Sequence, residues 1–296
     1  MAGTNKVMSL KEAISMIPDG ATVALGGFLL QNKPMAATRE MARQRKRGLF
    51  VICAAPSSLD IDLLAGAGCV ARAVVQSISA ERFGPTMPNF RKGVQDGTIE
   101  IVECDQGMVV AGLTAAKKGV PFIPTMAGLG GDFPKVNPDW FKIMQDPFFG
   151  EPTLAVRAMK PDFTLIHTLL ADSEGNAQHI GWPANDRLAC LAADRVIVTT
   201  EEVVPRQVVA AQPTRTVTFA YNVAAVAAVP YGAYPTACQG RYRYDEEAIR
   251  DYIAAGRGLA FERYLEKHVY GAPTQAKYME SIGIGRFLKA QTGREC

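Results

Sequence analysis

The amino-acid sequence predicts an α/β fold, in which an open, mostly parallel sheet carries helices on both faces. Short apolar runs rich in β-branched residues alternate with amphipathic stretches along the chain. Strands separated by helices in this way form βαβ units, whose strands run parallel. The chain has 296 residues, 48% of them hydrophobic, and so it is long and apolar enough to bury a full core.

The first half of the chain is expected to contain regular strand–helix pairs. Strands are predicted at residues 22–28, 49–54, 71–76 and 98–102, and helices at residues 35–45, 59–65, 90–95 and 108–118. The first of these helices should begin at Pro34, since proline is favoured at the first helical position.

The second half begins with a segment rich in Gly, Pro, Asp and Phe, residues 129–152, which is predicted to be a long loop with one turn of helix. Long irregular loops in compact domains tend to be functional. Strands follow at residues 163–167, 195–199 and 224–229, and helices at 187–193, 245–255 and 258–268. We expect a single domain over residues 1–296, with a helical C-terminal segment from about residue 245.

Composition and charge argue against several classes of protein. The net charge is +3, from 32 basic and 29 acidic residues, and so no nucleic-acid-binding face is expected. No signal peptide and no apolar run of about 18 residues is found, which favours a cytoplasmic protein without a membrane span. Six scattered cysteines and three histidines, none at metal-ligand spacing, predict reduced thiols and no metal site.

Gly26, Gly27 and Phe28 follow the first predicted strand. Ligands of parallel α/β folds bind at the carboxyl ends of strands, and glycines there let backbone N–H groups approach an oxyanion. A plain tight turn is the alternative interpretation, and from spacing alone it is the commoner one. The motif is not GxGxxG, so no dinucleotide site is predicted.

Other polar groups also follow strands. Asp105, Gln106 and Gly107 could reach the same cleft, or could simply begin a helix with Asp105 as its N-cap. The segment 172–176 (DSEGN) has the composition of a turn. His167, on an apolar strand, is expected to be a hydrogen-bonded core residue.

Eight segments, in the same order, resemble the A subunits of family I coenzyme A transferases, especially the glutaconate type. They are ALGGF (24–28), KPMA (33–36), GLTAAKKGVPFIP (112–124), DPFFGE (146–151), PDFTLIH (161–167), DSEGN (172–176), VIVTTEE (196–202) and VPYGAYPTACQGRYRYD (229–245). The likeness runs from about Val7 to Asp245.

The resemblance implies a fold of the CoA-transferase (NagB/RpiA-like) type and a partner B subunit, giving a heterodimer or a dimer of heterodimers. In this family a glutamate of the B subunit attacks the acyl-CoA, forms an acyl anhydride and then becomes a glutamyl-CoA thioester, and a carboxylate acceptor reverses the steps. Coenzyme A is thus a substrate, and no permanently bound cofactor is implied. Glu174 is accordingly not expected to be the nucleophile.

The resemblance also implies roles for residues of this chain. Gly26, Gly27 and Phe28 would stabilise the thioester oxyanion. The expected substrate-binding residues are Gln31, Ser77, Ser79, Gln106, Gly107, Gly128 and Gly130, the last two in the loop of residues 126–131 that is expected to set specificity.

Two alternatives to CoA transfer are open. Relatives with this fold hydrolyse a C–C bond of a ring-derived CoA ester or decarboxylate a CoA ester, and here Glu103 would be the acid–base group. Ring hydrolases carry an acidic residue where Gln106 stands, and this difference favours transfer. The more remote alternative is a non-catalytic effector-binding module.

Overall fold

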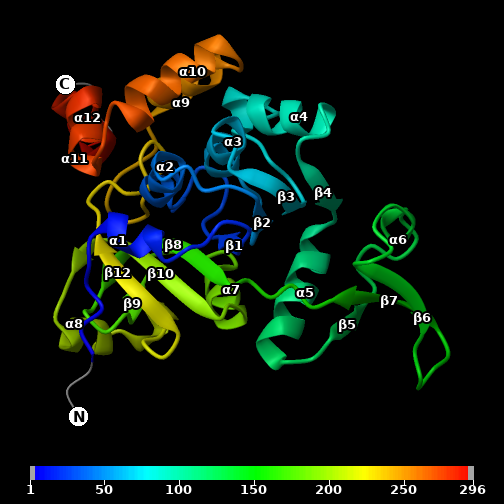
Figure 1. Ribbon diagram of the computed structural model, residues 1–296. Helices are drawn as coiled ribbons and strands as arrows, with labels where there is room; N and C mark the ends of the chain where they lie inside the picture. The colour runs from blue at the N-terminus through cyan, green and yellow to red at the C-terminus, as the bar shows by residue number, and fades with distance from the viewer. Residues whose placement is uncertain (1–3, 293–296) are drawn as a thin grey trace.

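Nine strands form the main sheet of the computed structural model, which describes residues 4–292 (Figure 1). The order across most of the sheet is β11 (Thr216–Thr218), β9 (Ala177–Gln178), β8 (Phe163–Ala171), β1 (Thr22–Leu25), β2 (Leu49–Cys53), β3 (Val70–Val75) and β4 (Glu100–Glu103). β10 (Arg195–Val203) also pairs with β8, and β12 (Val223–Ala228) pairs with β10.

The pairing confirms the predicted open, mostly parallel sheet. β1 runs parallel to both β2 and β8, and β10 runs parallel to both β8 and β12. The short strands β9 and β11 are antiparallel. The strands that were predicted from apolar runs are present, although the first ends at Leu25 rather than at residue 28.

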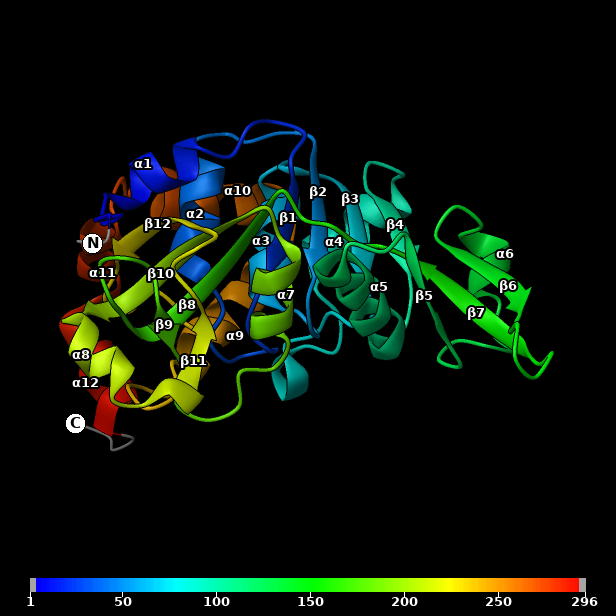
Figure 2. The same ribbon diagram turned by 90° about the horizontal axis from the view of Figure 1, so that it is seen from below.

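Helices cover both faces of this sheet (Figures 1 and 2). One face carries α1 (Leu10–Ser15), α2 (Met35–Arg43), α3 (Leu59–Gly66), α4 (Pro88–Gln95), α9 (Glu246–Ala255) and α10 (Leu259–Leu265). The other carries α5 (Gln106–Lys118) and α7 (Asp186–Ala192). Three short helical segments, η1 (Glu81–Phe83), α8 (Arg206–Ala210) and η2 (Pro213–Arg215), lie in connections.

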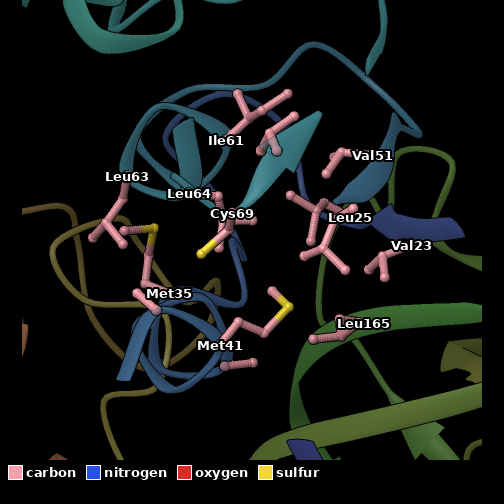
Figure 3. Close-up of a cluster of buried hydrophobic side chains, with 14 of the residues drawn as sticks. Val23, Leu25, Met35, Met41, Val51, Ile61, Leu63, Leu64, Cys69 and Leu165 are labelled. Atoms are coloured by element: carbon pink, nitrogen blue, oxygen red, sulfur yellow. The ribbon is translucent and has the colours of Figure 1, made fainter. Parts of the chain in front are cut away.

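The core follows from the alternation of side chains along each strand. Val23 and Leu25 of β1 face α2, where they join Met35 and Met41 in one buried cluster (Figure 3). Ala24, between them, points to the opposite face and joins the cluster under α5 and α7. A strand whose two faces are both buried contains an unbroken apolar run, which is why the sequence predicted these strands well.

Helix starts agree with the sequence in part. Ser9 and Glu12 form a capping box at α1, and Asp105 caps α5 by accepting from the Met108 N–H at 2.9 Å. Pro34 was predicted to be the first helical residue of α2, but it is the N-cap, with ψ at 55°, outside the helical range. The helix therefore begins one residue later, at Met35.

The C-terminal segment has more helices than the two that were predicted. α10 continues into a π-helical segment, η3 (Glu266–Tyr270), and α11 (Gln275–Ile282) and α12 (Ile284–Thr292) follow. Tyr278 and Phe287 from the last two helices pack on Tyr234 in a buried aromatic cluster. This cluster attaches the segment to the loop after β12.

The predicted loop at 129–152 contains the expected single turn of helix, but the prediction missed the strand at residues 141–145. A second, antiparallel sheet consists of β5 (Phe122–Thr125), β7 (Pro152–Arg157) and β6 (Phe141–Gln145), with a short helix, α6 (Phe133–Val136). We call residues 122–157 the arm; it projects beyond β4 at one end of the molecule (Figure 2). Trp140, Phe141 and Leu154 are buried in the cluster that includes α5 and attach the arm there.

The N-terminal residues cover the open side of β12. Val7 forms a parallel bridge to Val226, whose carbonyl accepts from the Met8 N–H at 2.9 Å and whose N–H donates to the Lys6 carbonyl at 2.9 Å. Residues 6–8 thus satisfy the backbone groups of Val226, in the middle of β12. Within residues 4–292, no helix is long and apolar enough to cross a membrane.

Candidate functional site

Most of the predicted site residues lie at the carboxyl ends of β1 to β4. Residues 26–32 follow β1, Gln76 and the two serines follow β3, and Gln106 begins the helix after β4. The carboxyl ends of parallel strands meet at one edge of the sheet, where α/β proteins bind their ligands. The structure therefore collects segments about 80 residues apart in the sequence at one edge.

The two glycines after β1 are required by the local geometry. Gly27 has φ +74°, and a Cβ added there would lie 2.6 Å from the Gln31 carbonyl oxygen. A Cβ at Gly26 would lie 2.8 Å from Asp186 Oδ1. A tight turn and a close contact with α7 thus explain both glycines without any ligand.

The backbone N–H groups that were predicted to stabilise an oxyanion are all engaged within the chain. Gly26 donates to the Leu165 carbonyl at 2.9 Å, Gly27 to Asp186 Oδ1 at 2.7 Å, and Phe28 to the Gln31 carbonyl at 2.9 Å. Buried N–H groups are nearly always paired in this way. None of these three N–H groups is an open donor in this structure, so the oxyanion role stays a prediction that requires one of these bonds to be exchanged.

A buried lysine, which the sequence analysis did not single out, supports this loop. Lys33 Nζ lies 3.1 Å from the Gly26 carbonyl oxygen, 2.9 Å from Ser57 Oγ and 3.1 Å from Asp60 Oδ2. Both charged side chains are fully buried. An unpaired buried charge is costly, so the ion pair and the carbonyl bonds stabilise one another. Only the KPMA match pointed to this position.

Three side-chain amides form a neutral polar cluster at the ends of β2 and β3. Gln76 Nε2 donates to Gln106 Oε1 at 3.0 Å and to the Cys53 carbonyl at 3.2 Å. Asn185 Nδ2 donates to the Ala54 carbonyl at 2.8 Å. The predicted residue Gln106 is therefore accompanied by Gln76 and Asn185, which the sequence analysis missed although one follows a strand and the other precedes a helix.

Phe28 and Gln31 extend from the glycine loop toward the surface. The Phe28 ring packs edge-on against Trp182, with ring centroids 4.9 Å apart, and Trp182 is 58% exposed. Gln31 Oε1 accepts from Gln239 Nε2, and both line a pocket of about 580 Å³ that also includes Arg241. An apolar surface and a polar pocket, lined by two arginines and a glutamate, thus flank the loop.

Ser77 and Glu103 line a second pocket, of about 280 Å³, on the β3–β4 side. Both residues are exposed, so the Glu103 carboxylate is in contact with solvent. Ser79 lies nearby, but its Oγ accepts from the Glu81 N–H at 2.8 Å and so belongs to a turn. The structure brings Ser77 and Glu103 together and leaves Ser79 with a structural contact.

The loop of residues 126–131 approaches the start of α5. A Cβ at Gly107 would lie 2.7 Å from the Ala127 Cβ, and one at Gly128 would lie 2.6 Å from Met108 Sδ. Gly130 has φ +89° and faces open space. Gly107 and Gly128 therefore belong to one contact region beside Gln106, whereas Gly130 lies outside it.

The structural interpretations of Asp105 as an N-cap and of the DSEGN segment as a turn are confirmed. Asp105 is the N-cap of α5, and the DSEGN segment is a turn in which Asp172 Oδ1 accepts from the N–H groups of Glu174, Gly175 and Asn176. Glu174 forms an ion pair with Arg206 at 3.3 Å.

Among residues 4–292, one group of metal-ligating side chains lies close together: His167, Glu201 and Cys238. Glu201 already accepts from His167 Nε2 at 2.8 Å, Tyr242 Oη at 2.8 Å and the Tyr231 N–H at 2.9 Å. His167 Nδ1 is paired with Thr199 Oγ1 at 3.0 Å, which confirms it as a hydrogen-bonded core residue. A metal ion would have to displace these bonds, so the group is a structural network.

The family model described as Coenzyme A transferase matches residues 7–228. The chain belongs to the coenzyme A transferase family. The A subunit of the 3-oxoadipate CoA-transferase of Pseudomonas knackmussii is 33% identical over 95% of this chain and 99% of that protein. An uncharacterized protein of Archaeoglobus fulgidus is 35% identical over 96% of this chain. The match spans 64% of the length of that protein.

Within that family, the chain corresponds to the A subunits and resembles the glutaconate type. The crystal structure of glutaconate coenzyme A-transferase from Acidaminococcus fermentans superposes with a TM-score of 0.91 at 28% identity, covering 98% of this chain and 97% of that one. The decarboxylase AibA/AibB superposes with a TM-score of 0.79 at 33% identity, over 90% of this chain and 98% of that one. The cholesterol ring-cleaving hydrolase IpdA subunit of Rhodococcus jostii is 31% identical, over 90% of this chain and 93% of the length of that subunit.

Proposed function

We propose that this chain is the A subunit of a heteromeric CoA transferase that moves coenzyme A between short carboxylic acids, dicarboxylic acids included. The observation that carries the proposal is the nearly full-length superposition on glutaconate coenzyme A-transferase. The partner is a B subunit, in a heterodimer or a dimer of heterodimers. Coenzyme A is a substrate, and no resident cofactor is needed.

In the proposed reaction a glutamate of the partner attacks the thioester carbonyl of the acyl-CoA, which forms an acyl-glutamyl anhydride and expels the CoA thiolate. The thiolate then attacks the glutamyl carbonyl of the anhydride, which releases the donor carboxylate and leaves coenzyme A on the glutamate as a thioester. An acceptor carboxylate reverses these steps.

The Gly26–Phe28 loop would stabilise the oxyanion after the internal N–H bond of Gly26 or Phe28 is exchanged, while the Gly27 N–H stays paired with Asp186. Gln76, Gln106 and Asn185 would offer neutral hydrogen bonds to the acyl carbonyl or carboxylate. Such uncharged donors suit a site that receives both an ester and a free acid.

The test uses this chain co-expressed with its B subunit. The complex is incubated with a panel of acyl-CoAs, and intact mass spectrometry measures whether coenzyme A becomes attached to the partner. An adduct that a free carboxylic acid discharges supports the proposal. Absence of an adduct with every acyl-CoA, in a complex that still consumes them, rejects the transferase.

CoA-ester decarboxylation or hydrolysis is the second candidate. The exposed Glu103 carboxylate shares a pocket with Ser77, and two relatives at 31% and 33% identity are named a hydrolase and a decarboxylase. Here Glu103 would move a proton. Release of CO2 or ring opening that Glu103→Gln abolishes would favour this function. Transfer that is unaffected by Glu103→Gln would exclude a role for this carboxylate.

A further inference from the structure

We propose that Asp186, held by His179, is a positioning residue for the reaction. It fixes the peptide group between Gly26 and Gly27 with its N–H toward Asp186 and its carbonyl toward Lys33. The proposal rests on the proposed function, because it assigns the glycine loop to the reaction site. Neither Asp186 nor His179 was singled out as a site residue from the sequence. They lie about 150 residues beyond the loop in the chain.

The contacts of Asp186 point away from its own helix. Asp186 is the first residue of α7 and is 1% exposed, yet α7 has no side-chain cap. Its Oδ1 accepts from the Gly27 N–H at 2.7 Å, and its Oδ2 lies 2.9 Å from Nε2 of His179, which is 3% exposed. Both carboxylate oxygens are thus used to connect the glycine loop to His179.

The same peptide group is held from its opposite end. The Gly26 carbonyl and the Gly27 N–H belong to one planar unit and point in opposite directions. Lys33 Nζ donates to that carbonyl at 3.1 Å, and Lys33 is itself paired with Asp60. Rotation of this peptide would break two charge-assisted hydrogen bonds in a buried environment, where each is worth more than in water.

Two neighbouring contacts are consistent with this role. A Cβ at Gly26 would lie 2.8 Å from Asp186 Oδ1, so the glycine permits the carboxylate to approach. The residue before Asp186, Asn185, donates to the Ala54 carbonyl at 2.8 Å. The start of α7 therefore fixes the segments after both β1 and β2, on which the proposed site is built.

The test measures kcat and KM for acyl-CoA in the complex with the B subunit. Asp186→Leu removes the acceptor of the Gly27 N–H, and we expect kcat to fall roughly 10- to 100-fold with little change in KM. Asp186→Asn keeps an oxygen that can accept from that N–H, so its kcat should lie between those of the wild type and Asp186→Leu. The order of the three kcat values distinguishes positioning from a loss of folded protein.

Asp62→Asn is the matched control. Asp62 is also fully buried and accepts from two backbone N–H groups, those of Asn89 and Phe90, both at 2.8 Å. Its side-chain partners are Asn89 and Tyr252, which lie outside the glycine loop. It should lower the melting temperature while kcat per assembled complex stays at the wild-type value. A wild-type kcat for assembled Asp186→Leu would overturn the proposal.

His179→Leu decides the question if Asp186→Leu does not assemble. It leaves Asp186 in place without its partner, so kcat should fall while His179→Gln, which can still donate, restores most of it. Equal and wild-type kcat in both variants would overturn the proposal. Failure of the proposed function is recognised separately, since the wild-type complex would then form no CoA adduct, and the same variants would be compared in whichever CoA-ester reaction it performs.

Discussion

At the scale of single residues, Glu201 is a buried carboxylate whose negative charge is compensated by hydrogen bonds. It is 6% exposed and accepts hydrogen bonds from two side chains and two backbone N–H groups. Burial alone would raise the pKa of Glu201, but hydrogen bonds from His167, the Tyr231 N–H and Tyr242 together hold it below its usual value. In the sequence this residue appears only within the VIVTTEE segment of residues 196–202.

Replacing Glu201 should therefore give a pH-dependent loss of stability. Because the folded-state pKa is depressed, the carboxylate contributes stability that is present above its unfolded pKa of about 4.3 and is lost as the pH falls through its folded-state value. We expect Glu201→Gln to cost about 1–3 kcal/mol at neutral pH in urea unfolding. The difference from wild type should shrink in acid. Glu202→Gln, at the exposed neighbour, should show neither effect.

The cysteines give a second prediction at this scale. Burial raises the pKa of Cys53 and of Cys69 to about 12, and Cys104, Cys190 and Cys238 are buried as well. Cys296 lies outside the described residues, so the experiment uses Cys296→Ser. Iodoacetamide at pH 8 should leave the folded variant unmodified by mass and should alkylate it after unfolding, because the thiolate is the reactive form. Rapid alkylation of the folded protein would contradict the burial of these thiols.

At the scale of elements, the turn after β1 depends on glycine. Gly27→Ala introduces both a left-handed backbone for alanine and contacts under 3 Å with backbone oxygens. Gly119, at the end of α5, has φ +67° with nothing near its Cβ position, so Gly119→Ala carries only the backbone cost of about 1–2 kcal/mol. Gly27→Ala should lose clearly more stability than Gly119→Ala in denaturant unfolding. Equal losses would mean that the turn relaxes freely.

Elements with strong local patterns were predicted well, and those without them were not. β2 is a continuous apolar run and β10 contains one at residues 196–198, and the sequence found both strands, although it ended the second at residue 199. The arm strand β6 has exposed residues at most positions and is paired with a strand that begins at Pro152. Its pairing partners decide that it is a strand, and a sequence window contains no such information.

The positions that complete the site escaped prediction for a related reason. Gly27 and Asp186 are 159 positions apart, and Lys33 and Asp60 are also brought together only by the fold. Sequence spacing locates motifs within one strand end, such as Gly26–Phe28 and Gln106. It does not show which buried charges support them or whether their N–H groups are already engaged. The single-domain boundary stays a prediction.

At the scale of the whole molecule, the two sheets should differ in local stability. β1 is buried on both faces, whereas the arm strands are partly exposed and the tip residues Phe148 and Phe149 are each 86% exposed. Local opening is easiest where few apolar contacts are buried. In amide hydrogen exchange, β5–β7 should therefore exchange before β1, β2 and β8. Equal protection of the two sheets would show that they open as one unit.

The cover of β12 by residues 6–8 has a consequence for handling the protein. A strand whose outer N–H and carbonyl groups are bare is a template for pairing with another chain. Deleting residues 1–8 should leave the sheet edge with the candidate site intact but favour self-association, seen as higher-mass species in size-exclusion chromatography. Deleting residues 1–3 should not. The short N-terminal segment is thus expected to keep the chain from self-associating through β12. Affinity tags are best joined ahead of this segment rather than in place of it.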